Sequence, residues 1–366
     1  MQYFNWLLPN WNPKLPTTEG EKDLALKQVM DEINKRFGEG AIAKGADAKG
    51  LVIKRLRTGS LSVDFATGGG WAMGNINEAY GPWSGGKTYL ALLTTAETQN
   101  TYPDAKVGWI DFEGAFDETW AKKIGVNTDE LLISSPATME DGLQIASMLI
   151  ESGEVALLVI DSMAAGSPKA ELEGDMDQST VGLRARVGNK FIRKFNPKHN
   201  ILSDELDLGR TTLLIINQEY QQIGAYAGPP VTPCGDQIKF GSMVRVRVRR
   251  GDLVQDKDGT ILMQQSKFVV EKNKTHPAKR EGSFVFSTKD NPKGKAGELY
   301  RAGEIIQFGT LTGTIRKSGA WLYLPESFGE VKFQGAPALA DWIAENPDMY
   351  KKLEEIVVAE LPNIKD

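Results

Sequence analysis

The chain has 366 residues, a formal net charge of −5 at pH 7, one cysteine and two histidines. This length accommodates one large domain and a smaller one, while the charge excludes a globally basic surface, so any nucleic-acid site has to be local. The composition argues against a disulfide and a histidine metal site, and without an apolar membrane span or a secretory signal we expect a cytoplasmic protein with no membrane partner.

Two segments precede the main domain. Residues 1–18 alternate prolines with aromatic residues, fit neither a helical nor a strand period, and predict an irregular arm. The segment 19–50 contains an amphipathic helix over 21–37, because its apolar residues fall on one face among charged ones. Gly38 and Gly40 then end this helix.

The most informative segment is 81–88, Gly-Pro-Trp-Ser-Gly-Gly-Lys-Thr, which fits the phosphate-binding pattern GxxxxGK(S/T) between an expected strand and an expected helix. Its glycines let backbone N–H groups turn toward phosphate oxygens, and the helix N-terminus adds its positive dipole end. Lys87 would reach the β- and γ-phosphates, and the Thr88 hydroxyl would bind Mg²⁺. The alternative, a plain glycine-rich turn, is disfavoured by this context. The residues expected to bind the nucleotide here are Gly81, Pro82, Trp83, Ser84, Gly85, Gly86, Lys87 and Thr88.

Three polar residues follow apolar strands, at the edge where open α/β sheets bind ligands. Glu113, after a strand over 106–111, could deprotonate the attacking water, or it could be a surface acid. Asp161, ending a strand over 155–161, could hold Mg²⁺ through water or cap a turn. Gln218 could hydrogen-bond the γ-phosphate, or it could satisfy a turn.

A basic helical face and a long loop offer a local site for nucleic acid. Arg186, Lys190 and Arg193 share one face of an expected helix that lacks acids, which suits a phosphate backbone or is an ordinary solvated face. The segment 219–237 is rich in glycine, proline and glutamine, and a loop of this length inside a compact domain is usually functional or disordered. Arginines also alternate with valines along 243–249, where we favour a solvated face.

The whole pattern predicts an α/β protein. Strands over 106–111, 155–161 and 211–217 alternate with helices and predict βαβ units in a mostly parallel sheet. The closely spaced strands over 243–249 and 267–271 predict an antiparallel extension. We place the core at 51–289. A linker-like stretch begins at 290, and residues 290–366 form a small second α/β domain with a hairpin at 320–324 and helices at 299–308, 336–345 and 348–360.

From residue 21 to about 361 the chain resembles the bacterial RecA recombinase family. The segments that carry the resemblance are Thr58–Asp64 (TGSLSVD), Tyr80–Thr88 (YGPWSGGKT), Pro168–Gly174 (PKAELEG), Asn217–Gln218, Lys239–Phe240 and Lys272–Lys274 (KNK). The resemblance implies a RecA-like P-loop ATPase core, an amino-terminal helix that packs on the adjacent protomer in polymerisation, and a small carboxyl-terminal domain that helps to engage duplex DNA.

The resemblance also implies roles for single residues of the nucleotide site. It makes Glu113 the catalytic carboxylate and Gln218 the γ-phosphate sensor, with Lys87 completing the catalytic set. Asp117 and Trp120 would contact adenine, with Trp120 in place of a tyrosine. Two lysines would reach the ATP held by the neighbouring subunit; they are Lys272 and Lys274.

For DNA, the resemblance implies two binding loops. The first is 174–182 with the helix after it, whose Arg186 and Arg193 match DNA-contacting arginines. The second is 219–237, with Gly224 and Gly235 among its DNA-binding positions. Departures from the family include an insertion within 196–209, a second loop that is one residue shorter, and six substituted positions. These are Trp83 in place of an acid, Gly85 in place of a serine, and Tyr220, Pro229, Pro230 and Cys234 in the second loop.

The implied function is DNA recombination and repair by an ATPase that DNA stimulates. With ATP and Mg²⁺, the protein would form a homo-oligomeric helical filament on single-stranded DNA and exchange strands with homologous double-stranded DNA. One alternative is a ring-forming motor with the same core, such as a helicase, which predicts closed hexamers. Another is a non-catalytic DNA-binding scaffold that uses ATP as a switch, against which the presence of Lys87, Glu113 and Asp161 argues.

Overall fold

The computed structural model describes residues 18–38, 41–44, 53–175, 182–195, 211–220 and 230–361. The predictions for the arm before residue 18, the insertion within 196–209 and Gly224 lie outside the described residues. The chain divides into two units, Met1–Ile53 and Lys54–Asp366. Among the described residues, every helix is too short or too polar to cross a membrane.

The first unit contains the predicted amino-terminal helix, α1 (Glu19–Phe37). It begins at a capping box, in which the Thr18 hydroxyl accepts from the Glu21 N–H at 3.3 Å and the Glu21 carboxylate accepts from the Thr18 N–H at 3.1 Å. Gly38 ends it with φ 103°, as its position predicted. The helix leaves Leu24, Leu26 and Phe37 exposed.

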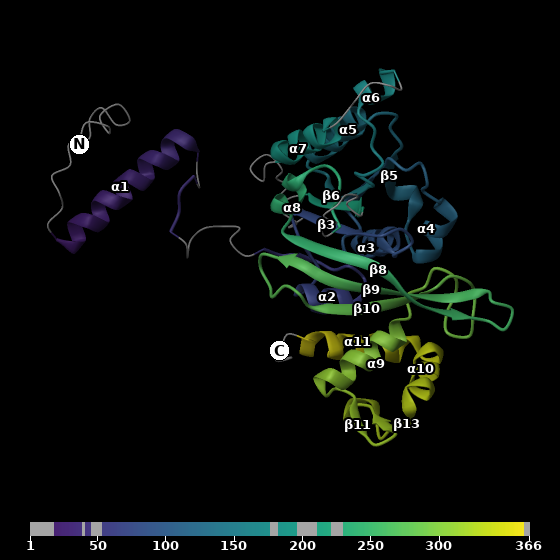
Figure 1. Ribbon diagram of the computed structural model, residues 1–366. Helices are drawn as coiled ribbons and strands as arrows, with labels where there is room; N and C mark the ends of the chain where they lie inside the picture. The colour runs from purple at the N-terminus through teal and green to yellow at the C-terminus, as the bar shows by residue number, and fades with distance from the viewer. Residues whose placement is uncertain are drawn as a thin grey trace. The chain divides into compact units, whose positions relative to one another are not determined.

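The second unit is built on a mixed sheet, whose eight described strands lie in the order β10-β9-β8-β3-β7-β6-β4-β5 (Figure 1). They are β3 (Ile76–Gly81), β4 (Lys106–Asp111), β5 (Leu131–Ser134), β6 (Val155–Asp161), β7 (Thr212–Gln218), β8 (Val244–Gln255), β9 (Ile261–Asn273) and β10 (Glu281–Ser287). The strands from β8 to β5 pair in parallel, while β9 and β10 pair antiparallel. This arrangement confirms the predicted fold class and the antiparallel extension.

Helices cover both faces of the parallel strands, because alternate residues of each strand point to opposite faces. Leu158 and Ile160 of β6, and Leu213 and Ile215 of β7, belong to one core with α5, α7 and α8. The helix α3 contacts the same strands and covers the other face (Figure 1). The helices of this unit before β8 are α2 (Leu61–Thr67), α3 (Lys87–Thr101), α4 (Glu118–Ile124), α5 (Met139–Glu151), α6 (Lys169–Glu173), α7 (Leu183–Lys194) and α8 (Asp236–Gly241). A short antiparallel pair, β1 (Arg55–Leu56) and β2 (Trp71–Ala72), flanks α2.

The carboxyl-terminal part has a core of its own. It contains α9 (Arg301–Thr312), α10 (Gly335–Glu345), α11 (Pro347–Glu360), β11 (Arg316–Ser318), β12 (Trp321–Tyr323) and β13 (Lys332–Gln334). The predicted hairpin is thus part of a three-stranded antiparallel sheet, since Phe333 pairs with Leu322. Leu61 of α2 joins this core. The buried Glu304 carboxylate of α9 accepts from the Ser60 hydroxyl at 2.5 Å and the Leu61 N–H at 2.9 Å, which fixes α9 to the start of α2.

Candidate nucleotide-binding site

The phosphate-binding loop lies between β3, which ends at Gly81, and α3, which begins at Lys87. Two positions of the loop require glycine, because φ is positive there and neighbouring atoms leave no space for a Cβ. A Cβ at Gly81 (φ 147°) would collide with the carbonyl oxygen of Val248, and one at Gly86 (φ 97°) with the hydroxyl of Ser266. The loop is therefore packed against β8 and β9, which leaves its other side free for a ligand.

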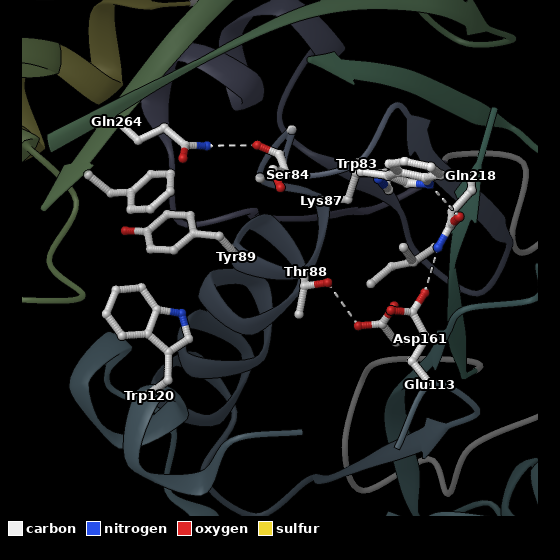
Figure 2. A pocket seen from close by; sticks show the side chains of 14 residues that line it. Trp83, Ser84, Lys87, Thr88, Tyr89, Glu113, Trp120, Asp161, Gln218 and Gln264 are labelled. Carbon is white, nitrogen blue, oxygen red and sulfur yellow. Dashed lines mark hydrogen bonds between the residues drawn. The ribbon is translucent and has the colours of Figure 1, made fainter. Parts of the chain in front are cut away.

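A cavity of about 490 Å³ opens beside this loop (Figure 2). It gathers most of the residues that the sequence predicted for the site, namely Trp83, Ser84, Gly85, Gly86, Lys87, Thr88, Glu113, Trp120, Asp161 and Gln218. The lining also includes Tyr89, Ile216, Gln264 and Phe286, which the sequence did not single out. Gly81 and Pro82 form the start of the loop and do not line the cavity.

Thr88 and Asp161 face each other on one side of the cavity, where the Thr88 hydroxyl donates to Asp161 Oδ2 at 2.9 Å (Figure 2). Asp161 is only 6% exposed, and its Oδ1 has no hydrogen-bond partner among the described residues. Burial, followed by the negative charge of Glu113, raises the pKa of Asp161 to about 7. A buried carboxylate oxygen without a donor, next to a hydroxyl oxygen, fits the oxygen ligands that Mg²⁺ prefers.

Lys87 is held inside the loop. Its Nζ donates to the Pro82 carbonyl oxygen at 2.7 Å, and the residue is buried. Burial lowers the pKa of the Lys87 ammonium, although the carboxylates of Asp161 and Glu113 act in the opposite direction. An anionic ligand in the cavity would therefore add to the stabilisation of this charge.

Asp111, to which the sequence gave no role, shapes the loop that presents Glu113. Its carboxylate accepts from the backbone N–H groups of Glu113, Gly114 and Phe116 at 3.0, 2.9 and 3.0 Å. An Asp that ends a strand and bonds the next N–H groups is a common turn signal, so this role could have been found from sequence. The turn places Glu113 in the cavity, where its Oε1 accepts from the Ser162 hydroxyl at 2.6 Å.

Gln218 joins Glu113 to the phosphate-binding loop. Its Nε2 donates to Glu113 Oε1 at 3.0 Å, and its Oε1 accepts from Trp83 Nε1 at 3.0 Å (Figure 2). The Tyr220 hydroxyl donates to the same Oε1 at 3.3 Å. The candidate base, the candidate sensor and the loop are thus connected by hydrogen bonds.

Aromatic rings line the other side of the cavity. Trp120 is half-buried, and Tyr89 stacks on Phe286 with ring centroids 3.8 Å apart. Asp117 does not line the cavity. Its carboxylate caps α4 by accepting from the Trp120 N–H at 3.0 Å, so its adenine contact stays a prediction.

Residues 24–288 match the family model described as the RecA N-terminal domain. The chain belongs to the RecA family. It is 38% identical over 347 residues to Protein RecA of Syntrophus aciditrophicus, covering 94% of this chain and 95% of that relative. It is 39% identical over 339 residues to Protein RecA of Bacillus licheniformis, covering 92% and 91%. A solved RadB recombinase matches with a TM-score of 0.45 at 22% identity, covering 63% of this chain and 94% of that one, which is too weak to bear on function.

As a RecA family member, the chain is an ATP-dependent recombinase and a DNA-dependent ATPase. The cavity beside the phosphate-binding loop is the candidate site for the nucleotide that this activity consumes. Two further sets of predicted residues, the paired lysines and the basic helix, lie outside that cavity.

In this RecA family member the two lysines lie toward the amino-terminal ends of the parallel strands, and the phosphate-binding loop lies at the carboxyl ends. Lys272 pairs with Arg245 in register, and Arg245 lies beside Glu78, near the amino-terminal part of β3. Lys272 Nζ donates to the carbonyl oxygens of Lys239 and Phe240 at 2.5 and 3.0 Å, and Lys274 Nζ donates to that of Phe240 at 3.2 Å. Burial, with the nearby Lys274 and Arg245 charges, lowers the pKa of Lys272 to about 8.

The predicted basic face is on the surface of α7. Arg186, Lys190 and Arg193 are exposed, while Phe191 and Ile192 pack into the core. A further basic residue of this segment, Arg184, is instead half-buried and pairs with Glu171 at 3.3 Å. Gly235, with φ 79°, directly precedes α8.

The solvated-face interpretation of the arginines on β8 is wrong for Arg245 and incomplete for Arg247. Arg245 forms an ion pair with the fully buried Glu78 and lies 4.4 Å from the centroid of the Tyr80 ring. Arg247 makes two hydrogen bonds of 2.8 Å to the Glu219 carboxylate. Their partners come from β3 and from the residue directly after β7, which the sequence alone does not place beside β8.

Proposed function

We propose that this recombinase binds ATP with Mg²⁺ in the cavity, assembles into a helical filament on single-stranded DNA, and exchanges strands with a homologous duplex. The observation that supports the proposal most is the convergence of Lys87, Thr88, Glu113, Asp161 and Gln218 on one cavity beside the phosphate-binding loop. These residues come from separate strands and from a loop, so their convergence depends on the fold rather than on one motif.

In this proposal Thr88 and Asp161 would hold Mg²⁺, whose charge would offset the negative charge of the phosphates. Asp161 Oδ1, which has no hydrogen-bond partner within the described part of the chain, is the atom that would serve this role. The backbone N–H groups of the loop and the amino end of α3 bind the phosphate oxygens. Lys87, which now donates to the Pro82 carbonyl, turns its ammonium to the β- and γ-phosphates.

Glu113 is proposed as the general base. Its carboxylate takes the proton from water as the water oxygen attacks the γ-phosphorus, and ADP departs with the bridging oxygen and its electron pair. Ser162 and Gln218 both donate to Oε1, which orients the carboxylate and leaves Oε2 to receive the proton. Gln218 Nε2–H can also donate to the γ-phosphate, because phosphate oxygens accept hydrogen bonds.

Assembly and DNA binding complete the proposal. Lys272 and Lys274 lie toward the amino-terminal ends of the parallel strands, whereas the cavity lies at their carboxyl ends. This placement supports a role at the ATP of the next protomer rather than at their own cavity. The exposed apolar residues of α1 suit packing on that protomer. On α7, Arg186, Lys190 and Arg193 would contact DNA phosphates, as would the second loop, which contains Gly224 and Gly235.

The test of the site is Glu113→Gln, which keeps the shape of the side chain and removes the base. We expect ATP and DNA binding to persist, and DNA-stimulated turnover to fall at least roughly a hundredfold, the usual contribution of a general base. Glu151→Gln, at an exposed acid near the end of α5, is the matched control. Turnover of Glu113→Gln close to wild type would refute the assignment.

A second measurement separates the filament from the ring-forming motor. Electron microscopy of the protein on single-stranded DNA with a non-hydrolysable ATP analogue should show helical filaments. Closed six-fold rings would instead support the helicase-type alternative, which leaves the exposed apolar residues of α1 without a partner.

A further inference from the structure

The side-chain oxygen of Gln218 accepts two hydrogen bonds from aromatic residues. Trp83 Nε1 donates to it at 3.0 Å and the Tyr220 hydroxyl at 3.3 Å. Both are positions where this sequence departs from the RecA pattern. Neither ring is held mainly by burial, because Trp83 is 74% exposed and Tyr220 is 42% exposed. We therefore expect these two residues to act at this site mainly through the hydrogen bonds of their polar atoms.

These contacts allow only one orientation of the Gln218 amide. An indole N–H can only donate, and an ionised carboxylate can only accept. The atom facing Trp83 must therefore be the amide oxygen, and the atom facing Glu113, 3.0 Å away, must be the amide nitrogen. The reversed amide would face Trp83 with a donor and Glu113 with an acceptor, and both hydrogen bonds would be lost.

We propose that Trp83 and Tyr220 are positioning residues for ATP hydrolysis, which keep the N–H groups of Gln218 directed at Glu113 and at the γ-phosphate. The inference rests on the proposed function, in which Gln218 donates to that phosphate. Because carboxylate and phosphate oxygens are both acceptors, the same amide orientation serves the site with and without ATP. Trp83 selects this orientation because its indole can only donate, and the Tyr220 hydroxyl adds a second hydrogen bond to the amide oxygen.

Tyr220 also connects this arrangement to the ends of the segment 221–229. Its N–H donates to the Val231 carbonyl oxygen at 2.9 Å, and the Val231 N–H donates back at 3.0 Å. A displacement of Tyr220 or Val231 would change the hydrogen bond to Gln218. The pair thus links the proposed second DNA loop to the residue that contacts Glu113.

The test replaces each donor with a ring that lacks it, in Trp83→Phe and Tyr220→Phe. We expect kcat of the DNA-stimulated ATPase to fall about 3- to 10-fold in each, the effect of one lost hydrogen bond, with KM for ATP nearly unchanged. Binding of a fluorescent non-hydrolysable ATP analogue, measured separately, should match wild type. Trp321→Phe and Tyr323→Phe, on β12, are the matched controls.

A double-mutant cycle decides whether Trp83 acts through Gln218. In a Gln218→Ala background, which has no amide to orient, Trp83→Phe should cost no further activity. An equal loss of activity from Trp83→Phe in the wild-type and the Gln218→Ala proteins would show that Trp83 acts on the loop without Gln218. No loss in either protein would show that Trp83 has no role in hydrolysis. Either result overturns the inference. Full turnover of Gln218→Ala or Glu113→Gln would instead mean that the proposed site itself has failed.

Discussion

The position of Lys272 and Lys274 makes a sharp prediction about assembly. On β9 they lie toward the amino-terminal ends of the parallel strands, whereas Gly81 begins the phosphate-binding loop at the carboxyl end of β3. The double variant Lys272→Ala with Lys274→Ala should therefore leave nucleotide binding by the isolated protomer nearly intact. If the lysines bind the ATP of a neighbouring protomer, DNA-stimulated ATPase and ATP-dependent filament formation should both collapse.

The size of the effect follows from the contacts that the two ammonium groups would make. Hydrogen bonds to charged groups contribute about 1.5–3 kcal/mol each, so two of them amount to about 3–6 kcal/mol per subunit interface. This corresponds to a fall of about 10²- to 10⁴-fold in the association constant between subunits. Among the described residues, the hydrogen bonds that the variant loses inside the protomer are those to the carbonyl groups of Lys239 and Phe240 in α8.

Light scattering and ATPase assays on single-stranded DNA, with the double variant beside wild type, measure this effect. Lys267→Ala is the matched control, because it removes a lysine from the same strand that pairs with the exposed Asp252. Thermal unfolding of each protein shows whether the variant is still folded. Filaments of ordinary length with ordinary turnover would refute the reasoning that these lysines bridge subunits.

Two further predictions concern α7 and α9. Arg186→Ala and Arg193→Ala should each weaken binding to single-stranded DNA and reduce the slope of log K against log salt by about 0.7, with little dependence on DNA sequence. The control Lys123→Ala should change neither the affinity nor the slope. Unchanged slopes in both arginine variants would show that this face of α7 is only solvated and does not bind DNA. Burial raises the pKa of Glu304 from its usual 4.5 to about 7, so the folded state binds this proton more tightly and stability falls as pH rises through that window, by roughly 3 kcal/mol. Glu304→Gln should remove this slope in urea unfolding measured from pH 4.5 to 8, and an unaltered slope would contradict the assignment.

The sequence predicts those parts of the site that local spacing determines. The phosphate-binding loop has a fixed pattern of residues, and Glu113, Asp161 and Gln218 each follow an apolar strand. Because carboxyl ends of parallel strands meet at one edge of a sheet, their convergence on a cavity follows once the sheet is parallel. The antiparallel extension was also predictable, since short connections between strands allow no crossover helix.

Contacts between residues distant in the chain were not predictable in this way. The bonds from Trp83 to Gln218, from Arg245 to Glu78 and from Ser60 to Glu304 join residues 135, 167 and 244 positions apart. The first two depend on the strand order, in which β3 lies between β7 and β8. Hydrophobic periodicity locates the strands but does not give their order in the sheet. The partners of the β8 arginines could therefore not be predicted, and a solvated face was the default interpretation.

The register between β3 and β7 explains why a substitution in the phosphate-binding loop affects Gln218. Gly81 pairs directly with Gln218, so a side chain extending from the next few loop residues meets the amide. An acid at position 83, as in the family pattern, can only accept, and it would compete with Glu113 for the N–H groups of Gln218. The indole of Trp83 does the opposite, because it occupies the amide oxygen and leaves one N–H group to Glu113 and the other to the γ-phosphate that we propose it contacts. If the proposed site is right, the tryptophan therefore leaves the N–H groups of Gln218, rather than its oxygen, for Glu113 and ATP.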